Sequence, residues 1–131
     1  MSLKSYLSNL FNDNKIRTDN LNVLSDMLFG RNTHPSLYIL RGGSDEIKRK
    51  FLEFINMLVD EQCHKICGTY YLCNMSPKFY TVVCDNTYSP YIHSYDKSIK
   101  IIQFDCEDGE LIDYDDEWVI PFRSMLHNLA L

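Results

Sequence analysis

Residues 37–59 read LYILRGGSDEIKRKFLEFINMLV, and this stretch decides the fold. Its apolar beginning belongs to a run from Ser36 to Leu40 that is bounded by turn residues, which is typical of a buried parallel strand. The glycines Gly42 and Gly43 mark a turn. Ser44 is a good N-cap for a helix, and apolar residues recur after it at helical spacing. The stretch therefore predicts a strand, a tight turn and an amphipathic helix, which is the repeating unit of α/β domains.

The turn has the spacing of a phosphate-binding loop but lacks part of its chemistry. In the motif G-x-x-x-x-G-K-[ST], backbone N–H groups cradle phosphate, the lysine reaches its outer oxygens, and the hydroxyl holds Mg²⁺. Gly42 and Lys48 fit that spacing. However, Ile47 replaces the second glycine and Arg49 replaces the hydroxyl residue. Neither side chain can do the original work, so we expect no catalytic residue and no nucleotide or other cofactor.

The first turn of the expected helix also carries its own negative charge. A helix N-terminus has unpaired N–H groups and a partial positive charge, which an anion or a capping side chain satisfies. Asp45 and Glu46 follow Ser44, so acidic side chains lie where a triphosphate would bind. A capped helix after a glycine turn also occurs in α/β domains that bind no nucleotide, and the motif alone does not separate these two interpretations.

Length and composition indicate one ordinary globular domain. The chain has 131 residues, of which 45% are hydrophobic and 24% are charged. No apolar run approaches the length of a membrane span, and residues 1–11, MSLKSYLSNLF, lack the apolar region of a signal peptide. The five cysteines are an odd number without a disulfide-framework spacing, which favours a reducing compartment. We therefore expect an intracellular protein with no membrane span.

Charge argues against a nucleic-acid-binding module. The formal net charge is −5, and acidic residues are concentrated between Asp105 and Glu117. Proteins that bind nucleic acid show a basic face, because contacts from Lys and Arg to phosphate dominate their affinity. The basic cluster of residues 48–50 would point in different directions on a helix. We expect no direct contact with nucleic acid.

Periodicity places further elements on both sides of the central unit. Apolar spacing predicts helices at the N-terminus and from Asp19 to Phe29, with a final helix from Ser124 to Leu129. Runs rich in β-formers predict four further strands: Thr69 to Cys73, Phe79 to Cys84, Ser98 to Phe104 and Trp118 to Phe122. The expected fold is one α/β domain over residues 1–131, with a helical lead-in (1–30) and a core (36–131) that has a partly parallel central sheet flanked by helices.

Three of the expected strands end in loops that begin with Gly42, Asp85 and Asp105, so these residues should lie side by side at the carboxyl edge of the sheet. The segment YDDEWVIPFRSML, residues 114–126, resembles the end of the ATPase core in superfamily 3 helicases, the primase-helicases of large DNA viruses and related phages. The helical lead-in, strand and turn up to Ser44 also resemble that family, which has a P-loop ATPase fold. The residues that match the family pattern are Gly42, Lys48, Asp85, Pro121, Phe122 and Ser124.

The departures from the family imply a protein that has lost catalysis. Asp105 stands where the family has a sensor asparagine, and the arginine pair expected before Val119 is absent. Asp85 and Asp105 are 105 − 85 = 20 residues apart, too few for the DNA-contacting hairpin that the family carries there. Phosphoryl transfer depends on positioned Lys, Mg²⁺ and arginine groups. The resemblance implies a catalytically inactive, viral, helicase-like protein in the host cytoplasm or nucleus, with a binding or structural role in DNA replication or virion assembly. Only Gly42, Lys48 and Asp85 would remain as vestigial phosphate-loop positions.

Two other functions stay open at this point. The first is a weak ATPase that uses Lys48 and Asp85, or an accessory subunit of a helicase ring. The second is a zinc-stabilised protein-interaction domain with Cys63 and Cys67 as ligands, although the paired Cys-x2-Cys spacing of strong zinc motifs is missing. For the favoured function we expect a protein partner and no metal. The family assembles as rings, so the resemblance also admits a homo-oligomer.

Overall fold

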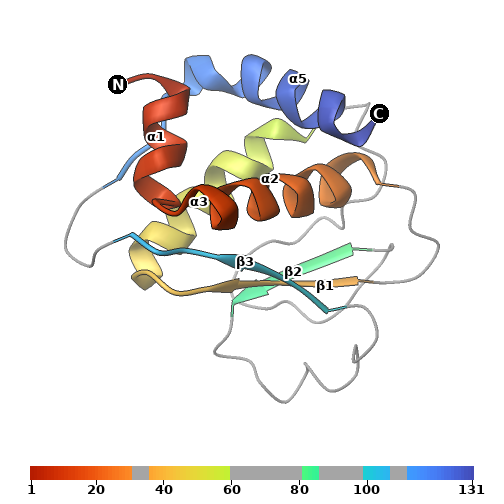
Figure 1. Ribbon diagram of the computed structural model, residues 1–131, viewed down its shortest axis with the longest axis horizontal. Helices are drawn as coiled ribbons and strands as arrows, with labels where there is room; N and C mark the ends of the chain where they lie inside the picture. The colour runs from red at the N-terminus through yellow and green to blue at the C-terminus, as the bar shows by residue number, and fades with distance from the viewer. Residues whose placement is uncertain (31–35, 60–80, 86–98, 107–111) are drawn as a thin grey trace.

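A computed structural model of the chain describes residues 1–30, 36–59, 81–85, 99–106 and 112–131. These residues form a mixed helix and strand fold, as the sequence predicts (Figure 1). The helices are α1 (Leu3–Leu10), α2 (Asn14–Phe29), α3 (Asp45–Leu58) and α5 (Val119–Ala130), with a short 3-10 helix, η2 (Asp116–Trp118). The strands are β1 (Ser36–Arg41), β2 (Thr81–Asp85) and β3 (Ile99–Gln103).

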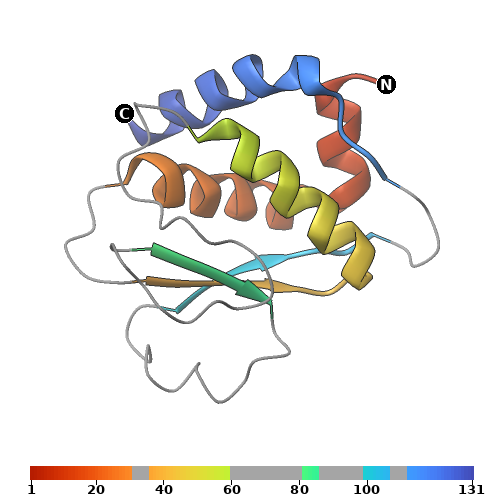
Figure 2. The same cartoon turned by 180° about the vertical axis from the view of Figure 1, so that it is seen from behind.

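The three described strands form a parallel sheet in the order β2-β1-β3. Ile39 of β1 pairs with Cys84 of β2 on one side and with Ile101 of β3 on the other. Figures 1 and 2 show α1, α2, α3 and α5 on the same side of this sheet. The described part of the domain is thus one sheet layer beneath one helix layer, and β1 is its central strand. The expected parallel sheet is confirmed for these strands.

Side-chain caps fix where the helices begin. The Ser2 hydroxyl accepts a hydrogen bond from the N–H of Ser5 at 3.1 Å and caps α1. The Asp13 carboxylate accepts from the N–H of Ile16 at 3.0 Å, so α2 begins at Asn14. The predicted start at Asp19 was wrong, because the cap at Asp13 provides an earlier acceptor for the orphan N–H groups.

The predicted strand from Trp118 to Phe122 was also wrong, because these residues belong to η2 and the first turn of α5. Pro121 occupies the third helical position, where its missing N–H would have no partner within the helix. Phe122 and Leu126, four residues apart, are both buried. A short run of β-branched and aromatic residues cannot be told from the start of a buried helix by periodicity alone.

The other predicted strands can be compared only in part. The run from Phe79 to Cys84 contains β2, which begins at Thr81, and the run from Ser98 to Phe104 contains β3. The predicted strand from Thr69 to Cys73 lies outside the described residues.

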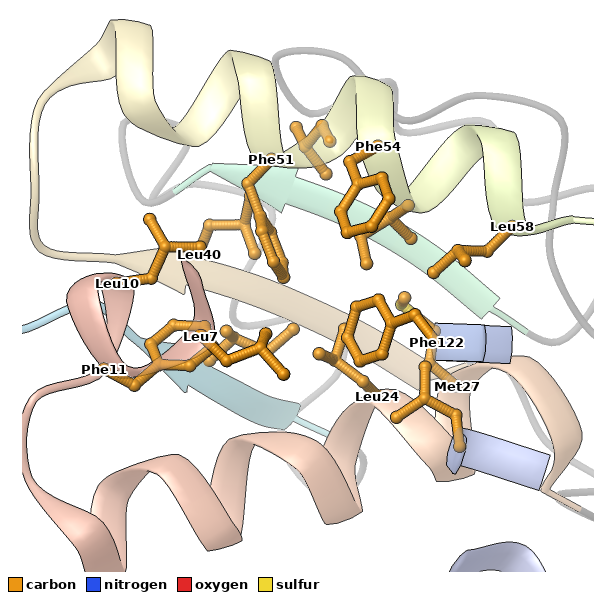
Figure 3. Packing of buried hydrophobic residues seen from close by; sticks show 14 of the residues in the cluster. Leu7, Leu10, Phe11, Leu24, Met27, Leu40, Phe51, Phe54, Leu58 and Phe122 are labelled. Carbon is orange, nitrogen blue, oxygen red and sulfur yellow. The ribbon is translucent and has the colours of Figure 1, made fainter. Parts of the chain in front are cut away.

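The hydrophobic core fills the space between the helices and the sheet. Figure 3 shows Phe51, Phe54 and Leu58 pointing from α3 into the same cluster as Leu40 of β1 and Phe122 of α5. Phe54 is fully buried, and its ring stacks against Tyr114 at 5.0 Å and Phe122 at 5.4 Å between centroids. Such aromatic contacts add to the stabilisation that comes from buried area. One side chain of α3 thus joins three parts of the chain.

Polar contacts attach α2 to the sheet. The buried Asn20 side chain donates to the carbonyl of Gln103 at 2.7 Å, and its own oxygen accepts from the N–H of Gln103 at 3.0 Å. The Asp26 carboxylate accepts from the hydroxyl of Tyr38 at 2.6 Å and also from the ammonium of Lys100. These bonds fix the position of α2 above β1 and β3.

We expect Phe54→Ala to lower the free energy of unfolding by about 3–5 kcal/mol, because it removes a fully buried ring and leaves a cavity. Met57→Ala on the same helix is the control, since Met57 is 39% exposed, and it should change stability by about 0.5 kcal/mol or less. Urea denaturation followed by circular dichroism measures both. Equal losses for the two variants would contradict the central position of Phe54.

Candidate functional site

The ends of the three strands meet at one edge of the sheet. Leu40 pairs with Asp85, and Arg41 pairs with Gln103, so β1 continues into Gly42 beside the ends of both neighbouring strands. This juxtaposition confirms the expected neighbourhood of Gly42, Asp85 and the residues that follow β3. In open parallel sheets, ligands bind outside the carboxyl ends of strands where the strand order reverses. The order β2-β1-β3 reverses beside β1, which makes this edge the candidate site.

The turn after β1 requires glycine at its first position. Gly42 has φ 82° and Gly43 has φ 70°, values in the left-handed region that favours glycine. A Cβ atom on Gly42 would lie 2.3 Å from the carbonyl oxygen of Phe104. The N–H of Phe104 also donates to the carbonyl of Arg41 at 2.8 Å, so the two strand ends remain in close contact. The turn is therefore tight because β3 packs directly against it.

Only three residues separate the end of β1 from the start of α3. A phosphate-binding loop has the order strand, G-x-x-x-x-G-K-[ST], helix, with the lysine next to the helix start. Here residues 45–47 already form the first turn of α3. The Ser44 hydroxyl accepts from the N–H of Ile47 at 3.2 Å, as the predicted cap requires. The backbone N–H of Ile47 therefore has its acceptor within the chain. The Ile47 side chain is 2% exposed and belongs to the core.

Lys48 lies within the helix, one position after Ile47, and is 6% exposed. Its ammonium nitrogen is 3.5 Å from a carboxylate oxygen of Asp45, whose side chain is 76% exposed. The lysine that would reach an outer phosphate oxygen in the motif thus lies beside a carboxylate from its own helix turn.

Asp105 holds the corner between α1 and α2. Its carboxylate accepts hydrogen bonds from the backbone N–H groups of Asn12 and Asp13, at 2.5 and 2.8 Å. The N–H of Asp105 donates to the carbonyl of Leu10 at 3.4 Å. The position that corresponds to a sensor residue in the resemblance thus forms a structural clamp. The sequence analysis missed this role, although the orphan N–H groups before a helix that begins at Asn14 are a signal for such an acceptor.

The acidic segment before α5 is engaged in local contacts. The ammonium of Lys50 lies 2.9 Å from the Asp113 carboxylate, and this hydrogen bond lowers the pKa of Asp113 and raises the pKa of Lys50. The Asp115 carboxylate accepts from the N–H of Glu117 at 2.9 Å and caps η2. These side chains attach the segment to α3 and begin the last helices.

The metal-binding alternative cannot be compared with the structure, because Cys63 and Cys67 both lie outside the described residues. Among the residues that the structure does describe, no three His, Cys, Asp or Glu side chains are grouped so that they could hold a metal ion. Asp85 ends β2 at the candidate edge.

Comparison of the chain with protein-family models, with curated proteins and with solved structures finds no match. In the described parts of the chain, no helix combines the length and the apolar character that a membrane crossing needs.

We expect Asp105→Asn to lower the free energy of unfolding by about 1–3 kcal/mol, because one of two backbone N–H groups would face an amide NH₂ instead of an acceptor. Asp19→Asn, at an exposed position on α2, should stay within about 0.5 kcal/mol of the wild type. Chemical denaturation at neutral pH compares them. If both variants were equally stable, the clamp would have no energetic role.

Ser44→Ala should cost about 1 kcal/mol of stability through loss of the cap of α3. The matched control is Ser124→Ala at an exposed position within α5, where alanine is a better helix former and the change should be about 0.5 kcal/mol or less. Thermal unfolding of both variants provides the measurement. A Ser44 variant as stable as the control would show that the N–H groups of α3 are satisfied in another way.

Proposed function

We propose that this chain is a non-catalytic α/β domain that acts by binding another protein. The observation that carries the proposal is the start of α3 at Asp45. Ser44 accepts a hydrogen bond from the N–H of Ile47, and Asp45 lies beside Lys48, so the chain itself supplies contacts to two groups that a phosphate would need. An anion would have to displace these contacts and bring its own charge beside Asp45 and Glu46, which is unfavourable.

We further propose that the domain is a shortened relative of the P-loop ATPase core of viral superfamily 3 helicases. The segment resemblances support this ancestry, as does the meeting of Gly42 and Asp85 at one sheet edge. Under this proposal, α3 has gained a turn at its N-terminus over the residues that formed the loop, which explains why the Gly42 to Lys48 spacing persists without a cradle. The implied role is a binding or structural one in DNA replication or virion assembly, in the cytoplasm or nucleus of the infected cell.

Exposed apolar side chains favour a binding role for the helix layer. Ile120 is 70% exposed and Leu129 is 48% exposed, both on α5. Single exposed apolar residues are common on protein surfaces. Ile120 lies on the opposite face of α5 from Phe122 and Leu126, which pack into the core, whereas Leu129 follows Leu126 by three residues on the same face. A partner that covers the outer face of α5 would remove the Ile120 side chain from water.

We expect titration calorimetry with Mg-ATP to give no affinity tighter than about 1 mM, or about 4 kcal/mol of binding free energy, because the cradle and the metal-binding hydroxyl are absent. No phosphate release should accompany it. Lys48→Ala is the control, and it should behave as the wild type does. Micromolar binding that disappears in Lys48→Ala would overturn the proposal and favour the weak ATPase.

The binding half of the proposal has its own test. Chemical crosslinking of the full chain in its native cells, followed by mass spectrometry, should identify one protein in stoichiometric amounts, with crosslinks to lysines of the helix layer such as Lys4. Crosslinks only between copies of the chain would show that the chain forms a homo-oligomer and binds no other protein. The absence of any crosslinked protein would contradict the proposal.

A further inference from the structure

A surface groove separates the beginning of α1 from α2 and α5. Its volume is about 540 Å³. Its lining residues belong to α1, α2 and α5 and to Ser2 just before α1, and these three helices lie in the helix layer above the sheet (Figure 1). The residues that line it are Ser2, Leu3, Lys4, Leu7, Ser8, Arg17, Leu21 and Met125.

The floor of the groove is apolar and continuous with the core. Leu7 is buried within the core cluster, and Leu3, Leu21 and Met125 are partly buried and pack against that cluster. These four side chains come from three helices, so the floor is a composite surface that exists only in the folded domain. Burial of such a floor against apolar side chains of a partner would provide the main favourable free energy of binding.

The rim of the groove is cationic. Lys4 is exposed at its edge, and the charged residues among the described lining are Lys4 and Arg17. Three hydrogen bonds fix the Arg17 guanidinium, which donates to the carbonyls of Phe11 at 2.8 Å and Asn12 at 3.4 Å and to the Asn14 side chain at 2.9 Å. The whole chain has a net charge of −5, so this groove is a local positive site on an acidic protein.

The neighbouring helices reinforce this sign. The sequence of α1, LKSYLSNL, contains Lys4 and no acidic residue, and that of α5, VIPFRSMLHNLA, contains no acidic residue. Helix α2 carries Asp19 and Asp26, but neither of these residues lines the groove. Complementary charge around an apolar contact selects partners and speeds their association. A basic partner would be attracted to most of this acidic protein, but only an acidic one is matched to this groove.

We infer that the groove binds an amphipathic helical segment of a protein partner, with Leu-like side chains on the floor and Asp or Glu side chains beside Lys4 and Arg17. Helix-in-groove recognition uses apolar anchors at i, i+3, i+4 and i+7. The inference rests on the proposed protein-binding function and assigns to it a place and a chemical class of partner.

The test uses an unbiased probe, a phage-displayed library of random helical peptides about 16 residues long, or about 24 Å as a helix. Selection on the full chain should enrich peptides that combine apolar residues at helical spacing with flanking Asp and Glu. Fluorescence anisotropy of the enriched peptides, made synthetically, then measures Kd for the wild type and for variants.

Lys4→Glu should weaken binding of the enriched peptides by about fivefold or more, because it places like charges together at the rim. The variant should still fold, since Lys4 is exposed and glutamate is favourable in the first turn of a helix. Lys15→Glu is the matched control: it makes the same charge change at an exposed position of α2 that does not line the groove. Its effect should be less than about twofold. Peptides in which Glu is replaced by Lys should regain affinity for the Lys4→Glu variant.

Several outcomes would overturn the inference. These are a selection that enriches nothing, one that enriches basic peptides, and equal losses for Lys4→Glu and Lys15→Glu. Binding of the chain to phosphatidylserine vesicles, lost in Lys4→Glu, would instead identify the groove face as a membrane-surface site. Concentration-dependent self-association that Lys4→Glu abolishes would identify a second copy as the occupant. Crosslinks to a partner at another surface would support the proposed protein-binding function but would show that the groove is not the binding site.

Discussion

N–H groups at the start of a helix need hydrogen-bond acceptors, and the arrangement of this domain depends on how its helices obtain them. Helix α3 uses Ser44, directly after the glycine turn, and this cap lets the helix begin after a connection of only three residues from β1. Helix α2 uses Asp13, and the two N–H groups just before the helix use Asp105 from the end of β3. The same requirement therefore sets both a local turn and a contact between distant parts of the chain.

The parts of the fold that were predicted correctly are those fixed by local chemistry. The strand from Ser36, the glycine turn and the Ser44 cap lie within nine residues of one another in the sequence, and each has a residue type that suits one conformation. The helix predicted from Ser124 to Leu129 lies within α5, but the starts of α2 and α5 were mistaken because each rests on a choice between two local signals. Asp13 and Asp19 can both cap a helix, and the VIPF run suits a strand as well as a buried helix turn.

The sequence predicted where the candidate site lies, but not which hydrogen bonds its residues make. Parallel strands bring their carboxyl ends to one edge, so the neighbourhood of Gly42 and Asp85 followed from the order of the elements. The clamp by Asp105 did not, because its partners Asn12 and Asp13 are more than 90 residues away in the sequence. From the sequence alone, a carboxylate at a strand end suggests a ligand-binding group. The structure shows instead that the Asp105 oxygens accept hydrogen bonds from the backbone of the same chain.

The hydrogen bonds between Asn20 and Gln103 have a further consequence for association between chains. Phe104 directs its N–H toward β1, so the N–H and carbonyl of Gln103 face the other way, along the outer edge of β3 in the described sheet. Such outward backbone groups are a template on which a foreign strand can add and aggregation can begin. The Asn20 side-chain amide hydrogen-bonds to both the N–H and the carbonyl of Gln103, as the backbone of a neighbouring strand would. At this position a side chain from a helix therefore blocks the addition of another strand.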